Sequence, residues 1–550
     1  MVGTCTLLSS SVVIVFLHLA YSVYSKPVQP NIVLVVADDL GYNDVGFRGS
    51  NTFVSTPNLD KLANEGVILE NHIVSATCSP SRSALMTGRY PIRTGFWKGN
   101  LDRDEEFGLG LDETLMPEML RRNGYRTHGV GKWHLGMYSW DHTPVKRGFE
   151  TWFGSYLAQQ DYFTHKTVDG IDFRDNYENV NGEVVDNVRS DLEGQYSTHL
   201  FTNRSVELIQ AHDQNEPLFL YLAYTSAHTP HQAPQEDVEK FAANISTNNT
   251  DFLKRKKYST MISIMDDGIG KVVNALNEKG MKENTVLVFT SDNGAGLIGS
   301  NYPLRGGKRS FFEGGVRGAS FVYSPRLEKT GYTNTNLHHV TDWYATFQKL
   351  VGDKPDQHEK PQLEIDGIDI WKSLSEGEPC REEVLYELRD PSKRLDYTGK
   401  NARDLARAYP VSLNTSSTTI QLPYDDMKPL KSSNYAQDFF AIRWKNWKLL
   451  TGTGLTVHGW SSPTGQADEY EKFSDENGKF HNWTIVSGTF LYNLSVDVRE
   501  KFNLADDHPD IVKKLLEKRQ GYMDIVKIIS ERNHDKDGVS LVDGVRKPWV

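Results

Sequence analysis

The chain has 550 residues, which is too many for one ordinary hydrophobic core, so a large and a small domain are expected. Its 61 Lys and Arg residues against 72 Asp and Glu residues give a formal net charge of −11. Because nucleic-acid binding needs clustered positive charge, this balance argues against a nucleic-acid partner, and an anionic substrate would need a local basic pocket.

Residues 1–25 are expected to form a secretory signal peptide. An apolar run from Val12 to Ala20 is followed by small residues, with cleavage expected near Ser25. The run is too short to span a bilayer and no stop-transfer pattern follows, which favours a signal peptide over a signal anchor. We therefore expect a secretory-pathway protein, lysosomal or secreted, without a membrane span. Six N-x-S/T sequons agree with this route: Asn203, Asn244, Asn248, Asn414, Asn482 and Asn493.

Cysteine is scarce in this chain. Cys5 would leave with the signal peptide, so the mature chain keeps Cys78 and Cys380. Two cysteines cannot build the disulfide framework of small secreted domains, and stability must come from a large core. At this stage Cys78 could be a functional residue, an inert buried thiol or the disulfide partner of Cys380.

Four apolar, strand-like segments end abruptly in polar residues: 31–39, 125–134, 216–228 and 284–293. Helical patterns lie between them at 56–66, 112–124 and 257–280, the second with Gly124 as its expected C-terminal cap. This alternation predicts a doubly wound, mostly parallel α/β sheet, with residues 26–390 as the catalytic domain.

The C-terminal part of the chain has a different pattern. Residues 391–435 are polar and irregular, which indicates a linker or a surface excursion. Residues 438–452 and 488–497 favour antiparallel strands, and 509–529 favour an amphipathic helix that covers one face of them. Residues 436–550 are therefore expected to form a small α+β domain with an antiparallel sheet.

The polar strand ends predict an active site, since ligands of such sheets bind at the carboxyl ends of the strands. Four oxygen donors suit a hard cation such as Ca²⁺ or Mg²⁺, whereas zinc would favour His or Cys: Asp38, Asp39, Asp292 and Asn293. The alternative is that these residues only cap helices. Four further side chains offer positive charge and hydrogen-bond donors to an anionic substrate: Lys132, His134, His228 and Lys308.

Cys78 precedes a predicted helix, so its side chain would lie near a helix N-terminus, where backbone N–H groups favour an anion. The segment CSPSRSALMTGRYP, residues 78–91, resembles the sulfatase signature C-x-P-S-R followed by T-G-R. NIVLVVADDLGYNDVG, GYRTHGVGKWHLG, TSAHTPH, VFTSDNGA and LRGGKRSFFEGGVR agree with it. The chain thus resembles the type I sulfatases of the alkaline phosphatase superfamily.

Within that family the chain is similar to the arylsulfatase B branch, the N-acetylgalactosamine-4-sulfatases. RGFETWFG, AIRWKNWKLLTG and LYNLSVDVREKFNLADDHPDIVKKLL carry this likeness. Two stretches depart from the branch. Residues 96–115 lack the cysteines that the branch places after the signature, and AQQDY at 158–162 stands where the branch has G-S-E-D-Y.

The resemblance implies that a formylglycine-generating enzyme converts Cys78 to formylglycine, an aldehyde whose hydrate has two hydroxyls. One attacks sulfur, and the other later loses its proton so that the covalent intermediate releases sulfate. The implied Ca²⁺ ligands are Asp38, Asp39, Asp292, Asn293 and the modified Cys78. Arg82 and Lys132 would support the deprotonated hydrate. His134 would act as base, His228 as proton donor to the leaving oxygen, and Lys308 as a sulfate clamp.

The resemblance also implies a substrate class, sulfate monoesters of sugars, with 4-sulfated N-acetylgalactosamine expected first. Small-molecule or aryl sulfates, such as dietary plant sulfates, are the alternative. A phosphatase or phosphonate hydrolase of the same superfamily is a second alternative. An inactive binder of sulfated glycans is a third, but such a protein would be expected to lack Cys78, Lys132 or His228.

Overall fold

The computed structural model describes residues 29–49, 54–168, 170–242, 250–296, 298–355, 362–389, 418–422, 439–457, 483–526, 541–542 and 545–548. The expected signal peptide with Cys5 lies outside these residues, as do four of the sequons: Asn244, Asn248, Asn414 and Asn482. Of the other two, Asn203 is exposed and Asn493 is half-buried. No helix in the described part of the chain is long and apolar enough to cross a membrane.

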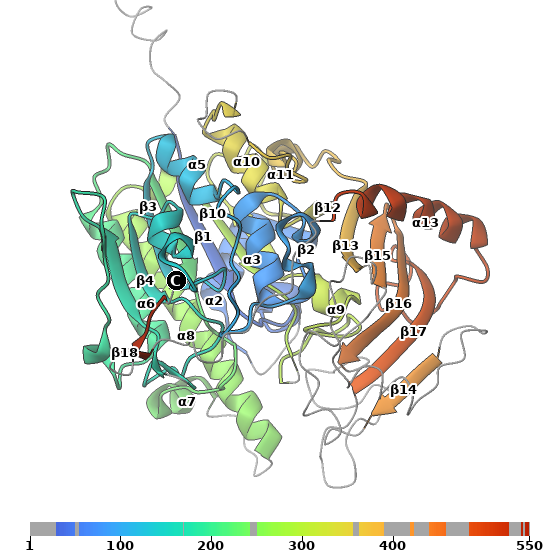
Figure 1. The fold of residues 1–550 in the computed structure, drawn as a ribbon, viewed down its shortest axis with the longest axis horizontal. Helices are drawn as coiled ribbons and strands as arrows, with labels where there is room; N and C mark the ends of the chain where they lie inside the picture. The colour runs from blue at the N-terminus through green and yellow to red at the C-terminus, as the bar shows by residue number, and fades with distance from the viewer. Residues whose placement is uncertain are drawn as a thin grey trace, which may run out of the picture.

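A ten-stranded sheet forms the centre of the large domain, in the order β12-β2-β11-β10-β1-β9-β3-β4-β7-β8 (Figure 1). Its central strands are β10 (Thr285–Ser291), β1 (Asn31–Ala37), β9 (Leu218–Ala223), β3 (Arg126–Lys132) and β4 (Thr151–Ser155). Its outer strands are β12 (Tyr332–His339), β2 (Val67–Ile73), β11 (Ser320–Tyr323), β7 (Arg174–Glu178) and β8 (Val184–Val185). The five central strands pair in parallel, which confirms the doubly wound sheet expected from the sequence.

Antiparallel pairs occur toward both edges of this sheet. On one side β11 pairs antiparallel with β10 and β2, and on the other β7 pairs antiparallel with β4 and β8. The sheet is therefore mixed, with the parallel strands at its centre, where both faces must be covered.

Helices cover both faces of the sheet, which explains the continuous apolar run of β1. Alternate side chains of a strand point to opposite faces. Ile32, Leu34 and Val36 pack in one core cluster, and Val33 and Val35 in another. The first cluster contains side chains of α3 (Cys78–Thr87), α5 (Met116–Arg122) and α10 (Asp342–Leu350). The second contains side chains of α2 (Pro57–Glu65), α6 (Ser197–Ala211) and α8 (Thr250–Glu278).

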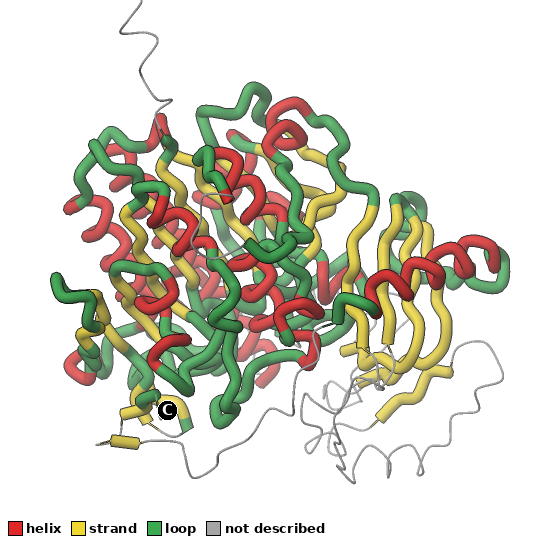
Figure 2. Tube along the Cα trace, turned by 45° about the horizontal axis from the view of Figure 1, so that its top comes forward, coloured by secondary structure: helices red, strands yellow, loops and turns green. Residues whose placement is uncertain are grey.

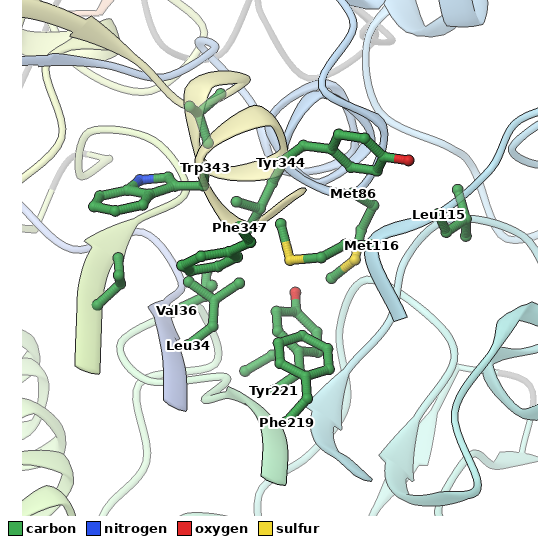
Figure 3. Close-up of a cluster of buried hydrophobic side chains, with 14 of the residues drawn as sticks. Leu34, Val36, Met86, Leu115, Met116, Phe219, Tyr221, Trp343, Tyr344 and Phe347 are labelled. Atoms are coloured by element: carbon green, nitrogen blue, oxygen red, sulfur yellow. The ribbon is translucent and has the colours of Figure 1, made fainter. Parts of the chain in front are cut away.

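Figure 3 shows part of the first cluster, where Met86 and Met116 lie between the aromatic side chains of α10 and those of β9. Burial of this kind contributes roughly 25 cal/mol per Å² of apolar surface. The two clusters place the sheet between two apolar layers, so the polar residues after each strand lie at its rim.

The C-terminal sheet is a separate group of strands crossed by a helix (Figure 2). Its order is β13-β15-β16-β17-β14. The elements are β13 (Glu383–Arg389), β14 (Thr418–Leu422), β15 (Phe439–Trp444), β16 (Trp447–Val457), β17 (Trp483–Asn493) and α13 (Pro509–Met523). All pairs are antiparallel, as expected for this part of the chain.

Two details differ from the expected domain limits. β13 pairs with β15, so the small sheet begins before residue 390, because an apolar segment of the first domain completes its edge. β14 pairs with β17 inside the stretch expected to be an irregular linker. The remainder of 391–435 lies outside the described residues.

A third, short sheet brings the end of the chain back to the large domain. It consists of β5 (Lys166–Thr167), β6 (Gly170–Ile171), β18 (Leu541–Val542) and β19 (Val545–Arg546), with Val545 paired to Ile171. Figure 1 shows β18 beside the large domain and far from the C-terminal sheet.

Candidate active site

The carboxyl ends of β1 and β10 bring four polar residues together. The parallel register from Asn31 with Thr285 to Ala37 with Ser291 makes the residues that follow both strands neighbours. The backbone N–H of Asp39 donates to Oδ1 of Asp292 at 3.3 Å. The amide of Asn293 donates to Oδ1 of Asp39 at 2.8 Å. Asp39 has a φ of 58°, a left-handed conformation that turns the chain sharply after the strand.

Cys78 lies at the start of α3, with Thr77 as the N-cap residue. Its side chain is fully buried, and Sγ is 3.3 Å from Oδ1 of Asp38. Both described cysteines are free, so the alternative of a disulfide with Cys380 is wrong. Burial, followed by the nearby carboxylates of Asp292 and Asp38, raises the pKa of the Cys78 thiol far above its usual value. Because the thiolate is the reactive form, the unmodified thiol is a poor nucleophile here.

Each of the three carboxylates, of Asp38, Asp39 and Asp292, forms an ion pair with a basic side chain. Lys132 Nζ donates to Oδ2 of Asp38 at 2.5 Å. Arg82 donates through Nε and Nη2 to Oδ2 of Asp292, at 3.1 and 2.9 Å. Lys308 Nζ is 2.6 Å from Oδ1 and 2.8 Å from Oδ2 of Asp39.

These contacts give the carboxyl groups different pKa values. Burial would raise the pKa of Asp39, but Lys308 and His228 outweigh it and hold that pKa well below its usual range. Burial and then the charge of Asp38 raise the pKa of Asp292 to about 6, against the opposing effect of Arg82. Each carboxylate is thus balanced by one basic side chain, and their clustered oxygens are candidate ligands for a divalent cation.

Arg82 is held rigidly under the site. Its Nη1 donates to the backbone carbonyl of Lys132 at 3.0 Å and to the Tyr221 hydroxyl at 3.3 Å. It is 1% exposed. Tyr221 was not expected at the site, because it lies inside the apolar run of β9 and nothing in the sequence distinguishes it from core residues.

The two histidines present opposite ring atoms to the site. His228 donates from Nδ1 to the Thr229 carbonyl at 2.7 Å, and its Nε2 is 3.7 Å from Oδ2 of Asp39. Burial and then Lys308 lower the pKa of His228 to about 3. His134 donates from Nε2 to the Leu101 carbonyl at 2.9 Å, while its buried Nδ1 has no partner among the described residues. That Nδ1 keeps a lone pair that can accept a proton.

Carboxylate and amide oxygens lie beside a thiol and an imidazole where a divalent cation could be held. Ligand atoms of four buried or largely buried residues lie within 4.8 Å of one another: Asp38, Asp39, Cys78 and His228. Oδ1 of Asn293 is buried and has no hydrogen-bond partner among the described residues, although its own amide nitrogen is bonded to Asp39. A buried, unpartnered oxygen beside carboxylates is the environment of a cation ligand.

A cleft of about 670 Å³ opens beside this cluster. Leu101, which accepts the hydrogen bond of His134, lines it, as do Pro230, two residues after His228, and Arg309, which follows Lys308. Gln159 and Gln160 of the AQQDY stretch also line it. The site thus has a polar chamber next to it that is large enough for part of a substrate.

Comparison with known proteins gives consistent relatives. A model of the sulfatase family matches residues 30–353, more than half of the chain. Arylsulfatase J of Mus musculus is 37% identical over 535 residues, covering 95% of this chain and 80% of that protein. N-acetylgalactosamine-6-sulfatase of Mus musculus is 33% identical over 376 residues, covering 66% of this chain and 69% of that protein.

Solved structures agree on the fold. Ps i-CgsB in complex with k-i-k-neocarrahexaose is similar with a TM-score of 0.68 and 27% identity, covering 92% of this chain and 96% of that one. The phosphonate monoester hydrolase of Agrobacterium radiobacter is similar with a TM-score of 0.55 and 18% identity, covering 90% and 96%. The second likeness is one of fold alone.

Proposed function

We propose that this chain, which belongs to the sulfatase family and is a sulfuric ester hydrolase of the arylsulfatase type, works through a formylglycine made from Cys78. One observation carries this proposal. Cys78 lies buried at the start of α3, 3.3 Å from a carboxylate, where its thiol is held in the unreactive protonated form. A cysteine in this position serves better as the precursor of another group than as a nucleophile itself.

The proposed cofactor is Ca²⁺. Asp38, Asp39, Asp292 and Asn293 would hold it with the modified residue 78, because the carboxylates of Asp38 and Asp39 lie close to residue 78 and Oδ1 of Asn293 is buried with no described partner. When bound, the cation offsets negative charge on the sulfate group. The hydrated formylglycine supplies one hydroxyl to attack sulfur and a second whose deprotonation allows sulfate to leave.

Three basic side chains prepare the site for an anion. Lys132 and Arg82 hold Asp38 and Asp292 in place, and both are buried, so their positive charge is little screened by water. Lys308 is 12% exposed and in contact with Asp39, and it is next in sequence to Arg309, which lines the cleft. We assign it to the sulfate oxygens.

The histidines divide the proton transfers. His134 keeps a free lone pair at Nδ1, which suits the base that removes the proton of the second hydroxyl so that sulfate can leave. His228 directs Nε2 at the site because Nδ1 is bonded to Thr229. With a pKa near 3 it is neutral in the resting site, so it must gain a proton as the anionic substrate offsets the charge of Lys308. It then donates that proton to the leaving oxygen.

The substrate is proposed to be a sulfate ester of a sugar, first of all 4-sulfated N-acetylgalactosamine. The arylsulfatase B-like motifs support the 4-position, whereas one relative is named as a 6-sulfatase of the same sugar. The structural relative in complex with k-i-k-neocarrahexaose supports a carbohydrate. Arylsulfatase J, by its name, keeps small aryl sulfates as the second candidate.

We propose a catalytic domain that begins at residue 26 and contains every site residue from Asp38 to Lys308. The C-terminal domain then takes in β13 and β14 as well, ahead of the expected limits of 390 and 436. Passage through the secretory pathway, where the formylglycine-generating enzyme would act, is supported by the expected signal peptide at residues 1–25 and by the exposed sequon at Asn203 on α6.

Hydrolysis of an aryl sulfate and the matching aryl phosphate tests the chemistry. The enzyme made with the formylglycine-generating enzyme should prefer the sulfate, and Cys78→Ala should lose turnover of it while keeping its fold. A preference for the phosphate, or full sulfatase activity of Cys78→Ala, would contradict the proposal.

A further inference from the structure

The side-chain amide of Gln160 is buried without a partner. Gln160 is 3% exposed, and neither its Nε2 nor its Oε1 has a hydrogen-bond partner among the described residues. An amide offers two donors and an acceptor with two lone pairs, and buried groups of this kind are normally satisfied. The neighbouring Gln159 has the same side chain and lines the same cleft, but it is exposed to solvent.

Hydrogen bonds hold the backbone that follows Gln160 in one conformation. The unpartnered amide therefore belongs to an ordered loop. Oδ1 of Asp161 accepts the N–H groups of Phe163 and Thr164 at 3.0 and 2.8 Å. Gln232 donates to Oδ2 of Asp161 at 2.6 Å and accepts the N–H of Tyr162 at 2.9 Å. This network anchors the residues that follow Gln160 to the segment after His228.

The cleft that Gln160 lines is bordered by close neighbours of the site residues. Leu101 accepts the hydrogen bond of His134, Pro230 follows His228 by two residues, and Arg309 is next to Lys308. A sulfate group held between Lys308 and the carboxylate cluster would therefore have its alcohol portion in this cleft. Gln160 belongs to the wall of this cleft, so its amide would meet the part of the substrate that distinguishes one sulfate ester from another.

We propose that Gln160 is a specificity-determining residue whose amide forms a donor–acceptor pair with a hydroxyl or acetamido group of a sulfated saccharide. This inference rests on the proposed sulfatase function and deepens it. A sugar ring carries groups that both donate and accept hydrogen bonds, and it would satisfy the amide on binding. The ring of an aryl ester such as 4-nitrophenyl sulfate has no hydrogen-bond donor, so it cannot satisfy both the donor and the acceptor of the Gln160 amide.

The charged residues that line the cleft are consistent with a neutral hydrogen-bonding contact between Gln160 and the substrate. Three basic residues line it (Arg103, Lys166 and Arg309), and so do three acidic ones (Asp102, Asp104 and Asp161). The lining therefore has no net charge, and recognition by hydrogen bonding is favoured over recognition by charge.

Kinetics of three proteins on two kinds of ester test the proposal. The wild type, Gln160→Met and the matched control Gln210→Met, at an exposed glutamine of α6 outside the cleft lining, are assayed on 4-nitrophenyl sulfate and on the 4- and 6-sulfates of N-acetylgalactosamine. Gln160→Met keeps the side chain's volume and removes its polar atoms. It should lower kcat/KM about 10- to 100-fold for the sugar sulfate that the wild type prefers, mainly through KM. The kcat/KM for the aryl ester should change by no more than about twofold, and Gln210→Met should change neither value.

Thermal melting without substrate gives a second readout. Removing a buried unpartnered amide should leave the melting temperature of Gln160→Met equal to or above that of the wild type. A lower melting temperature, equal losses on both esters, or no loss on the sugar would overturn the proposal. A wild type that cleaves the aryl ester and no sugar sulfate would overturn it while the sulfatase function stands. A wild type that cleaves neither would overturn the proposed function itself.

Discussion

Substitution of Asn293 by alanine should separate cation binding from folding. Asn293 Oδ1 is buried without a described partner, so in the metal-free protein this oxygen costs about 1–3 kcal/mol. Its amide nitrogen donates to Asp39, a charge-assisted bond that contributes about 1.5–3 kcal/mol. The two effects nearly cancel, and we expect Asn293→Ala and wild type to have free energies of unfolding within about 1 kcal/mol in a chelator.

Added Ca²⁺ should stabilise the wild type more than Asn293→Ala. At 100 times its Kd, the cation stabilises the wild type by about 2.7 kcal/mol. If loss of the Asn293 oxygen weakens the affinity about 100-fold, the same concentration equals the Kd of the variant and stabilises it by only about 0.4 kcal/mol. For a domain larger than 250 residues, 2.7 kcal/mol corresponds to a rise in melting temperature of at most about 5–11 °C.

The assay is thermal melting of both proteins with a chelator and with Ca²⁺. The control is Asn176→Ala in β7, a buried asparagine whose amide is bonded to Tyr156 and Asp186. It should be less stable overall but keep the full calcium response. An Asn293→Ala protein with the wild-type response to Ca²⁺, or a wild type with no response, would refute the assignment of this residue as a cation ligand.

Two further predictions concern activity and acid stability. Lys308→Met should lower kcat/KM for a sulfate ester about 100- to 1,000-fold. The control Lys372→Met, at a side chain 63% exposed on α11 (Trp371–Glu376), should leave kcat/KM unchanged. Wild-type activity of Lys308→Met would rule out its contact with sulfate. Burial, then His338 and Arg48, lower the pKa of His72 from 6.5 to about 3, and its Nε2 accepts the Trp343 N–H at 3.0 Å. Between pH 6.5 and pH 3 the ring of His72 is therefore protonated in the unfolded chain and neutral in the folded chain. The free energy of unfolding is thus highest above pH 6.5 and falls toward pH 3, by about 2 kcal/mol at pH 5. Denaturant unfolding at pH 7 and pH 5 should show a smaller decrease for His72→Gln, and an equal decrease would contradict this sign.

The central strands and the polar residues at their ends could be predicted from the sequence, because burial on both faces requires continuous apolar runs. Parallel strands also end at the same rim of the sheet, which makes Asp39 and Asn293 neighbours once β1 pairs with β10. Lys308 follows no strand, so the strand pattern does not explain its place at this rim, and its role as a sulfate clamp came only from the family resemblance. In the structure its backbone N–H donates to the Ala295 carbonyl, which brings the loop back to the site.

Other features depend on contacts between distant segments, which no local pattern specifies. β13 joins the C-terminal sheet across the expected domain limit because its apolar side chains complete the edge next to β15. Lys448 lies in β16 where alternation would suggest a solvent-facing residue. It is instead fully buried, bonded to Glu313 at 2.8 Å and to Glu500 at 2.9 Å. Gln160 likewise reads as a surface glutamine in a loop, and only its burial beside the cleft distinguishes it from Gln159.

The central claim is that Cys78 is the precursor of the catalytic group, and the mass of one tryptic peptide tests it most directly. The peptide is 62–82, bounded by Lys61 and Arg82. It should be measured from enzyme that is active on a sulfate ester and was made in a eukaryotic secretory host. We predict that residue 78 carries an aldehyde in place of the thiol, in proportion to the activity of each preparation. A peptide in which Cys78 is entirely alkylatable as free thiol, recovered from fully active enzyme, would contradict the account.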